Sequence, residues 1–139
     1  IGQTCRNVSE ADALDYVLGY TCGNDVSARD WQASDPTFWR AKASDTFSPI
    51  GPYIVTGLDP STLNVKARVN GNEVQNYNGG DIIFDTAACI SYISQSVTLE
   101  PGDILYTGTG GTQVDMHHGD VVEIEIEGIG ILSNPVVVE

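Results

Sequence analysis

The sequence lacks long apolar runs and is poor in basic residues. No segment approaches the ~18 consecutive apolar residues that a membrane-spanning helix needs, and no basic segment followed by an apolar one opens the chain. We therefore expect neither a transmembrane helix nor a signal peptide. The 6 Lys and Arg residues are outnumbered by 19 Asp and Glu residues, which gives a net charge of −13. Phosphate backbones repel such a chain, which argues against DNA, RNA and anionic membranes as partners.

Cysteine is also scarce, and Cys5, Cys22 and Cys89 form no CxxC pair. Their odd number and spacing argue against a disulfide framework and against structural zinc. A reducing, cytoplasmic compartment is the expected location. The sequence contains no GxxxxGK[ST] loop, no GxGxxG turn, no GxSxG motif and no HExxH motif. These absences argue against nucleotide-binding folds and the common hydrolase triads.

The length of 139 residues indicates one domain, and 15 glycines and 6 prolines separate short apolar runs, as in β-rich proteins. Apolar–polar alternation and turn signals predict strands over 20–26, 53–56, 63–69, 73–77, 104–107 and 121–127, with short strands within 128–138. Asn70-Gly71 predicts a two-residue hairpin. Helices are predicted over 9–18 and over 86–94, the second capped by Asp85, and 27–52 is expected to be irregular. The predicted fold is mostly β, with about eight strands in a roll or barrel and peripheral helices.

Two segments carry the polar residues of a candidate site. Acidic, basic, amide and hydroxyl side chains gather in NDVSARDWQ, residues 24–32, where a predicted strand enters a proline-rich loop. Lys42 follows this loop, and an ordinary ion pair is an equal alternative to a functional role. The glycines and threonines of 107–112 suit a loop whose backbone N–H groups approach an anion. A simple tight turn between strands is the alternative there.

Two other clusters favour plainer roles. Glu123, Glu125 and Glu127 alternate with apolar residues and so share one strand face. This pattern is typical of a solvated face, with a cation-binding row as the alternative. His117 and His118 stand directly before a glycine, which favours an exposed turn over a group of metal ligands.

Together the segments resemble the fumarylacetoacetate hydrolase superfamily over essentially the whole chain. The resemblance rests on NDVSARDWQ at 24–32, K-x-x-DTF-x-P-x-GP at 42–52, VNG at 69–71, DIIF at 81–84, TLEPGDILYTGT at 98–109 and GDVVEIEIEGIGILSNPV at 119–136. It implies a mixed β-roll, a homodimer and chemistry on small 2-oxo acids, as in aromatic catabolism. The family's reactions include hydrolytic C–C cleavage of acylpyruvates and fumarylacetoacetate, decarboxylation of oxaloacetate-like acids, and isomerisation. Their shared step is an enolate held on a divalent ion, Mg²⁺ or alternatively Mn²⁺ or Ca²⁺.

The resemblance also implies roles for single residues. Asp25 matches the metal-ligating aspartate of the family. Lys42 matches a lysine that stabilises negative charge on the enolate, and Arg29 is expected to assist it from the substrate pocket. Glu123 matches a glutamate that helps to activate water in the fumarylacetoacetate-cleaving branch.

Gln32 and Thr109 match residues that contact the substrate, Thr109 through the substrate carboxylate. The chain departs from the family pattern at Thr109-Gly110-Gly111, where a Thr-Pro-x-Gly turn is common, and this leaves the substrate open. Two further metal ligands, a Glu-x-Glu pair, and a lid histidine are expected upstream of Ile1-Gly2. Residues 1–139 are thus expected to form a single catalytic domain that lacks its N-terminal portion.

Three interpretations follow from the resemblance. The first is a metal-dependent hydrolase that cleaves a C–C bond in an acylpyruvate-like or fumarylacetoacetate-like 2-oxo acid. The second is an oxaloacetate-type decarboxylase or an isomerase of the same family. The third, of another class, is a non-catalytic β-roll that acts as a scaffold or processed remnant without a complete metal site.

Overall fold

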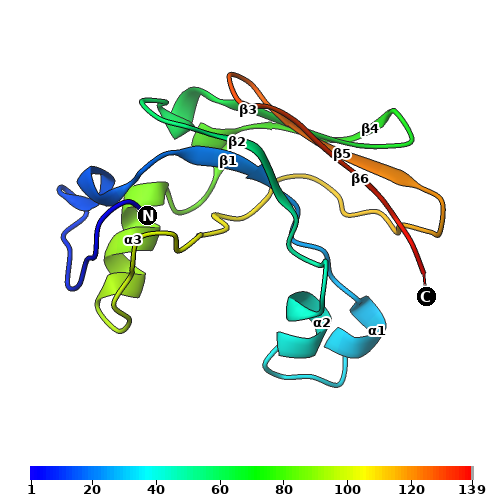
Figure 1. Cartoon of the computed structure of the whole chain (residues 1–139), viewed down its shortest axis with the longest axis horizontal. Helices are drawn as coiled ribbons and strands as arrows, with labels where there is room; N and C mark the ends of the chain where they lie inside the picture. Colours follow the sequence, from blue (N-terminus) through cyan, green and yellow to red (C-terminus); the bar gives the residue numbers. More distant parts are fainter. Residues whose placement is uncertain (139) are drawn as a thin grey trace.

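The computed structural model describes residues 1–138, and its strands form two antiparallel sheets. The smaller sheet pairs β1 (Tyr20–Gly23) with β2 (Ile50–Val55). The larger sheet has the order β4-β3-β5-β6, with β3 at Asn64–Val69, β4 at Asn72–Asn78, β5 at Val121–Ile126 and β6 at Gly130–Pro135. Figure 1 shows β1 and β2 beneath the larger sheet. The predicted mostly-β fold with peripheral helices is confirmed.

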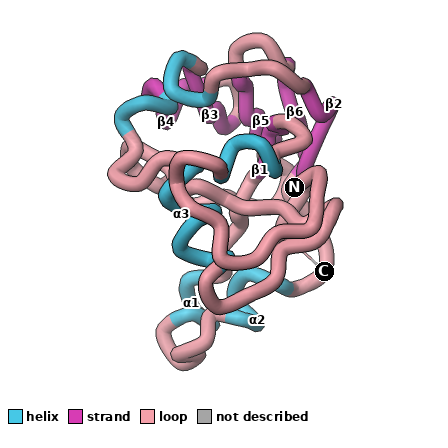
Figure 2. Tube along the Cα trace, turned by 90° about the vertical axis from the view of Figure 1, so that its left-hand side faces the viewer, coloured by secondary structure: helices cyan, strands magenta, loops and turns pink. Residues whose placement is uncertain are grey.

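The helices are short and lie outside the sheets (Figure 2). They are α1 (Arg29–Gln32), α2 (Trp39–Ala43) and α3 (Thr86–Ser94), with 3-10 turns η1 (Ala13–Tyr16), η2 (Pro60–Thr62) and η3 (Gly79–Asp81). In residues 1–138, no helix has the length and apolar character needed to cross a bilayer.

The register of the larger sheet defines two faces. Ala67 pairs with Gln75 on one side and with Ile124 on the other, and Ile124 pairs with Leu132. Partners in register share a face, so these residues form what we call the inner face. Leu132 on this face is buried against Cys22 of β1, which places the smaller sheet over the inner face. The neighbouring residues along each strand point the other way, to the outer face.

A second core joins α3 to the N-terminal segment. Ile90 of α3 is buried together with Cys5, Val8, Ala13 and Leu99. The Asp85 carboxylate accepts a hydrogen bond from the Ala88 N–H at 2.8 Å, which caps the helix as predicted.

The β3–β4 hairpin also forms as predicted. Asn70 and Gly71 have φ values of 52° and 76°, the left-handed pair that a type I′ turn requires. The predicted strands over 63–69, 73–77 and 121–127 correspond to β3, β4 and β5, and one strand, β6, lies within 128–138. These elements share strong local signals, which is why their positions could be predicted.

The helix predicted over 9–18 is wrong, because this segment contains only the 3-10 turn η1. Ser9 does donate to the Asp12 carboxylate at 2.7 Å. However, the Asp15 and Val17 N–H groups bond three residues back, and the Tyr16 carbonyl accepts from the Gly2 N–H at 2.8 Å. That long-range bond gives the Tyr16 carbonyl a partner at the point where the turn ends.

Two further predictions need correction. Residues 27–52 are not simply irregular, because they contain α1, α2 and the start of β2. Helices of four and five residues are too short for a periodic apolar pattern to reveal them. The strand predicted over 104–107 is absent from the described part of the chain, which has six strands rather than about eight. Those residues instead form a loop that reaches the candidate site.

Candidate functional site

An ion pair lies just beyond the end of β1. The Lys42 ammonium of α2 donates to Oδ2 of Asp25 at 2.5 Å. Backbone bonds bring the two segments together, because the Val26 N–H donates to the Phe47 carbonyl and the Ala28 N–H to the Ala41 carbonyl. Both charged side chains are partly exposed. The fold therefore fixes the pair in a place that solvent reaches.

Arg29 and Gln32 lie one turn apart on α1, the helix that follows Asp25 in the chain. The Arg29 guanidinium donates to the Gln32 side-chain oxygen at 2.5 Å. This spacing of three residues places both side chains on the same helix face. The five donors of a guanidinium can serve this contact and still reach a carboxylate.

The loop after Pro101 brings Tyr106 to the end of β1. A Cβ atom added at Gly23 would lie 2.6 Å from a ring carbon of Tyr106, so the glycine makes room for the ring. Burial raises the pKa of the Tyr106 phenol, a hydrogen bond with Ser48 lowers it, and the charge of Asp25 raises it. Sequence reasoning missed Tyr106 and Ser48. Both residues lie in segments that carry the family resemblance, at 98–109 and 42–52, but nothing local in either segment indicates that the two side chains meet.

Thr109 continues the same loop across β4. Its hydroxyl donates to the Gln75 side-chain oxygen at 2.9 Å, and the Gln75 amide donates to the Thr112 carbonyl at 3.3 Å. A Cβ atom added at Gly110 would lie 3.0 Å from the Tyr77 ring, so the loop lies close against the inner face. Tyr106 and Thr109 are three residues apart, which limits their separation to ~10 Å. The loop thus connects the Asp25 end of β1 with Gln75, a residue that sequence reasoning also missed.

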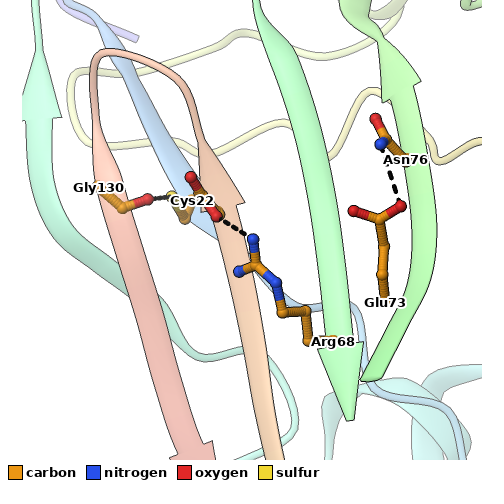
Figure 3. Close-up of polar contacts among 6 residues, drawn as sticks. Cys22, Arg68, Glu73, Asn76 and Gly130 are labelled. Atoms are coloured by element: carbon orange, nitrogen blue, oxygen red, sulfur yellow. Dashed lines mark hydrogen bonds and ion pairs between the residues drawn. The ribbon is translucent and has the colours of Figure 1, made fainter. Parts of the chain in front are cut away.

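Glu123 is the predicted site residue that the sheet does not bring to this place. It pairs with Arg68 in register, on the outer face, whereas Gln75 lies on the inner face. Arg68 donates to Glu125 at 2.5 Å (Figure 3). That hydrogen bond raises the pKa of the Arg68 guanidinium, against the opposing effect of desolvation. The glutamates of β5 therefore belong to a charged outer face that is partly solvated.

The described residues do not complete a divalent-metal site on their own. Residues 1–138 hold no group of three or more His, Cys, Asp or Glu side chains placed to share an ion. Asp25 offers one carboxylate, whereas Mg²⁺ requires about six oxygen ligands. His117 and His118 lie at a turn as predicted, with Gly119 at a φ of 92°. The His118 Nδ1 atom accepts from the Val138 N–H at 3.1 Å.

Comparison with known protein families gives one match across nearly the whole chain. A family model described as "Fumarylacetoacetate (FAA) hydrolase C-terminal" matches residues 1–137. An uncharacterised protein from Archaeoglobus fulgidus is 52% identical over 137 residues, which cover 99% of this chain and 55% of that protein. A mitochondrial oxaloacetate tautomerase from Xenopus laevis is 44% identical over 149 residues, which cover 99% of this chain and 47% of that protein. The chain spans about half the length of the curated relatives it matches.

Solved structures share the fold. The 2-hydroxyhepta-2,4-diene-1,7-dioate isomerase from Mycobacterium marinum matches with a TM-score of 0.96 and 50% identity, over 99% of this chain and 54% of that one. Maleylpyruvate hydrolase from Sphingobium sp. SYK-6, in complex with manganese(II) and pyruvate, matches with a TM-score of 0.88 and 37% identity. That match covers 99% of this chain and 50% of the hydrolase.

Proposed function

Since this chain belongs to the fumarylacetoacetate hydrolase family, we propose that it forms the catalytic domain of an enzyme that stabilises the enolate of a small 2-oxo acid. The observation that carries this proposal is the Asp25–Lys42 pair at the end of β1. It brings an ammonium group and a carboxylate together in one partly exposed place, and the charge of Asp25 also acts on the Tyr106 phenol. The enolate chemistry of 2-oxo acids requires such a set.

Each residue has a chemical task in this proposal. The Lys42 ammonium faces the developing oxyanion and stabilises it, a contribution that grows as charge develops in the transition state. The Arg29 guanidinium assists Lys42 in stabilising this negative charge, and Gln32 beside it contacts the substrate. The Thr109 hydroxyl, which donates to Gln75 in this structure, rotates to donate its one proton to the substrate carboxylate from the loop side.

Hydrolytic C–C cleavage is the first candidate reaction, and isomerisation or tautomerisation is the second. Cleavage needs a base that activates water, and Glu123, the residue proposed for that task, has its side chain on the outer face of the sheet. Isomerisation and tautomerisation need only an enolate and proton transfer. A relative named as an isomerase and one named as a tautomerase have higher identity to this chain than the maleylpyruvate hydrolase does. These observations favour the second candidate.

We also propose a divalent ion as cofactor, with Asp25 as one ligand. The support is the manganese(II) that the related maleylpyruvate hydrolase binds and the oxygen donor that Asp25 provides. The roles proposed for Lys42 and Arg29 do not depend on this divalent ion. We propose a homodimer as well, on the basis of the family resemblance alone. A cytoplasmic location is supported by the free thiols of Cys5, Cys22 and Cys89.

The test is a substrate panel with the purified protein and its variants. Acetylpyruvate, fumarylpyruvate and oxaloacetate are assayed with Mg²⁺ or Mn²⁺, while absorbance follows loss of the enol and a coupled assay follows pyruvate. Lys42→Met removes the oxyanion donor, and we expect kcat to fall about 10²- to 10³-fold. Asp25→Asn is also expected to lower kcat by orders of magnitude. Loss of the enol without pyruvate indicates tautomerisation, whereas pyruvate production indicates cleavage or decarboxylation.

The matched control is Lys66→Met, because Lys66 lies on the outer face opposite Glu125. This variant loses the same charge and should keep full activity. Full activity in both Lys42→Met and Asp25→Asn would contradict the proposal. If the wild-type protein neither acts on the panel nor binds Mn²⁺ in calorimetry, the non-catalytic scaffold is supported instead.

A further inference from the structure

The helical unit formed by residues 28–47 contains almost no apolar core of its own. Ala41 is its one buried residue, whereas Trp31 is 38% exposed and Trp39 is 71% exposed. Helices as short as α1 and α2 are unstable in isolation. Figures 1 and 2 both show the two helices at the lower end of the molecule, apart from the larger sheet. Contacts other than core burial must therefore hold this unit together.

A stack of three side chains runs through the unit. The Arg40 guanidinium carbon lies 4.3 Å from the centre of the Trp31 ring. The Trp31 and Phe47 rings are 6.3 Å apart at their centres and inclined by only 7°. Arg40 belongs to α2, Trp31 to α1 and Phe47 to the segment that leads into β2, so the stack joins three segments. A guanidinium over an indole face combines charge attraction with planar stacking.

The charge of Arg40 has no carboxylate partner in the part of the chain that the structure describes. The two ion pairs among residues 1–138 are Lys42–Asp25 and Arg68–Glu125. The Arg40 backbone N–H donates to Asp35 at 3.0 Å. Asp35 also accepts from the N–H and the hydroxyl of Thr37. Asp35 thus organises the start of α2 through backbone contacts, and the Arg40 guanidinium is left to Trp31.

From these contacts we infer that Arg40 is a positioning residue for the candidate site. Arg40 and Lys42 are two residues apart on α2, and Trp31 lies between Arg29 and Gln32 on α1. The stack therefore sets the two helices relative to each other, which holds Lys42 against Asp25 and orients the Arg29–Gln32 pair. The roles of Lys42, Arg29 and Gln32 toward a substrate rest on the proposed function, whereas the positioning itself does not.

The chain contains two lysines, Lys42 and Lys66, so labelling of one can be measured against the other. Brief acetylation with acetic anhydride, followed by peptide mass spectrometry, measures the labelling of Lys42 with Lys66 as the internal reference. We expect Arg40→Met, which keeps length but loses charge, to raise the Lys42-to-Lys66 ratio about two- to fivefold, the range set by a weakened exposed ion pair. Arg40→Lys keeps the cation and should restore part of the wild-type ratio. Arg6→Met is the matched control for loss of one basic residue and should leave the ratio unchanged.

A second measurement reports on the stack directly. In a Trp39→Phe background Trp31 is the one tryptophan, since the chain has 2. Arg40→Met should then shift Trp31 emission and increase quenching by acrylamide, and Arg40→Lys should do so less. An unchanged labelling ratio in Arg40→Met overturns the inference, even if the fluorescence changes, because the stack would then have no effect on Lys42. If the ratio changes while Lys42→Met and Asp25→Asn both keep full activity, the positioning stands and the proposed function fails.

Discussion

Gly23→Ala should destabilise the protein through a collision with Tyr106. The added Cβ atom would lie 2.6 Å from Cε1 and 3.1 Å from Cζ of the ring, whereas carbon atoms in contact are normally ~3.5–4.0 Å apart. The ring must therefore move by about 1 Å. Overpacking of this kind costs ~1–3 kcal/mol. We expect the lower half of that range, because Tyr106 is 42% exposed and can swing outward.

The sign of the effect should depend on Tyr106. Without the collision, alanine in place of a strand glycine is expected to stabilise by ~0.5–1 kcal/mol. In a Tyr106→Ala background, Gly23→Ala should therefore be neutral or stabilising. In a Tyr106→Phe background, which keeps the ring, it should remain destabilising.

Equilibrium urea unfolding followed by circular dichroism measures all six proteins, and the double-mutant cycle isolates the coupling between the two positions. A coupling of ~1–2 kcal/mol, the cost expected for the collision, should result. If Gly23→Ala costs the same with and without the Tyr106 ring, the contact with that ring is not the reason why position 23 needs glycine. Because Tyr106 is on the loop of Thr109, the same variant also tests whether the loop depends on this contact.

Two further predictions concern stability. Ile90→Ala removes a side chain that is 1% exposed and should lower the free energy of unfolding in urea by ~2–5 kcal/mol. Ile83→Ala, at a residue that is 92% exposed, should lower it by less than ~0.5 kcal/mol. Equal losses of stability in the two variants would contradict the assigned core. The pKa of Asp120 is lowered, first by the His117 N–H and then by the Asn70 amide. Its contribution to stability is therefore fully present above the unfolded value of ~3.9 and is lost as the pH falls through the lower folded value. Asp120→Asn should flatten the acid side of the stability profile in thermal unfolding, and an unaltered profile would argue against this linkage.

Local signals in the sequence predicted several elements correctly. Asn70-Gly71 specified the hairpin because few residues adopt two successive left-handed conformations. Asp85 specified the start of α3 because its carboxylate satisfies a free backbone N–H within three residues. The apolar–polar alternation over 121–126 specified β5, because it too is a signal carried by neighbouring residues. The nine-residue segment 24–32 likewise placed Asp25, Arg29 and Gln32 near one another, because they are neighbours in the chain.

Contacts between distant segments had to come from the tertiary structure. The sequence left an ordinary ion pair and a functional role as equal alternatives for Lys42 and indicated no partner for it, because nothing local determines where α2 packs. Period-two alternation placed Glu123 on one face of its strand, but the packing of β1 on the opposite face decided which side meets the candidate site. Tyr106 against Gly23, and Thr109 bonded to Gln75, join residues 83 and 34 positions apart. Local propensity carries no information on such pairs, since their energy comes from the packing of the complete fold.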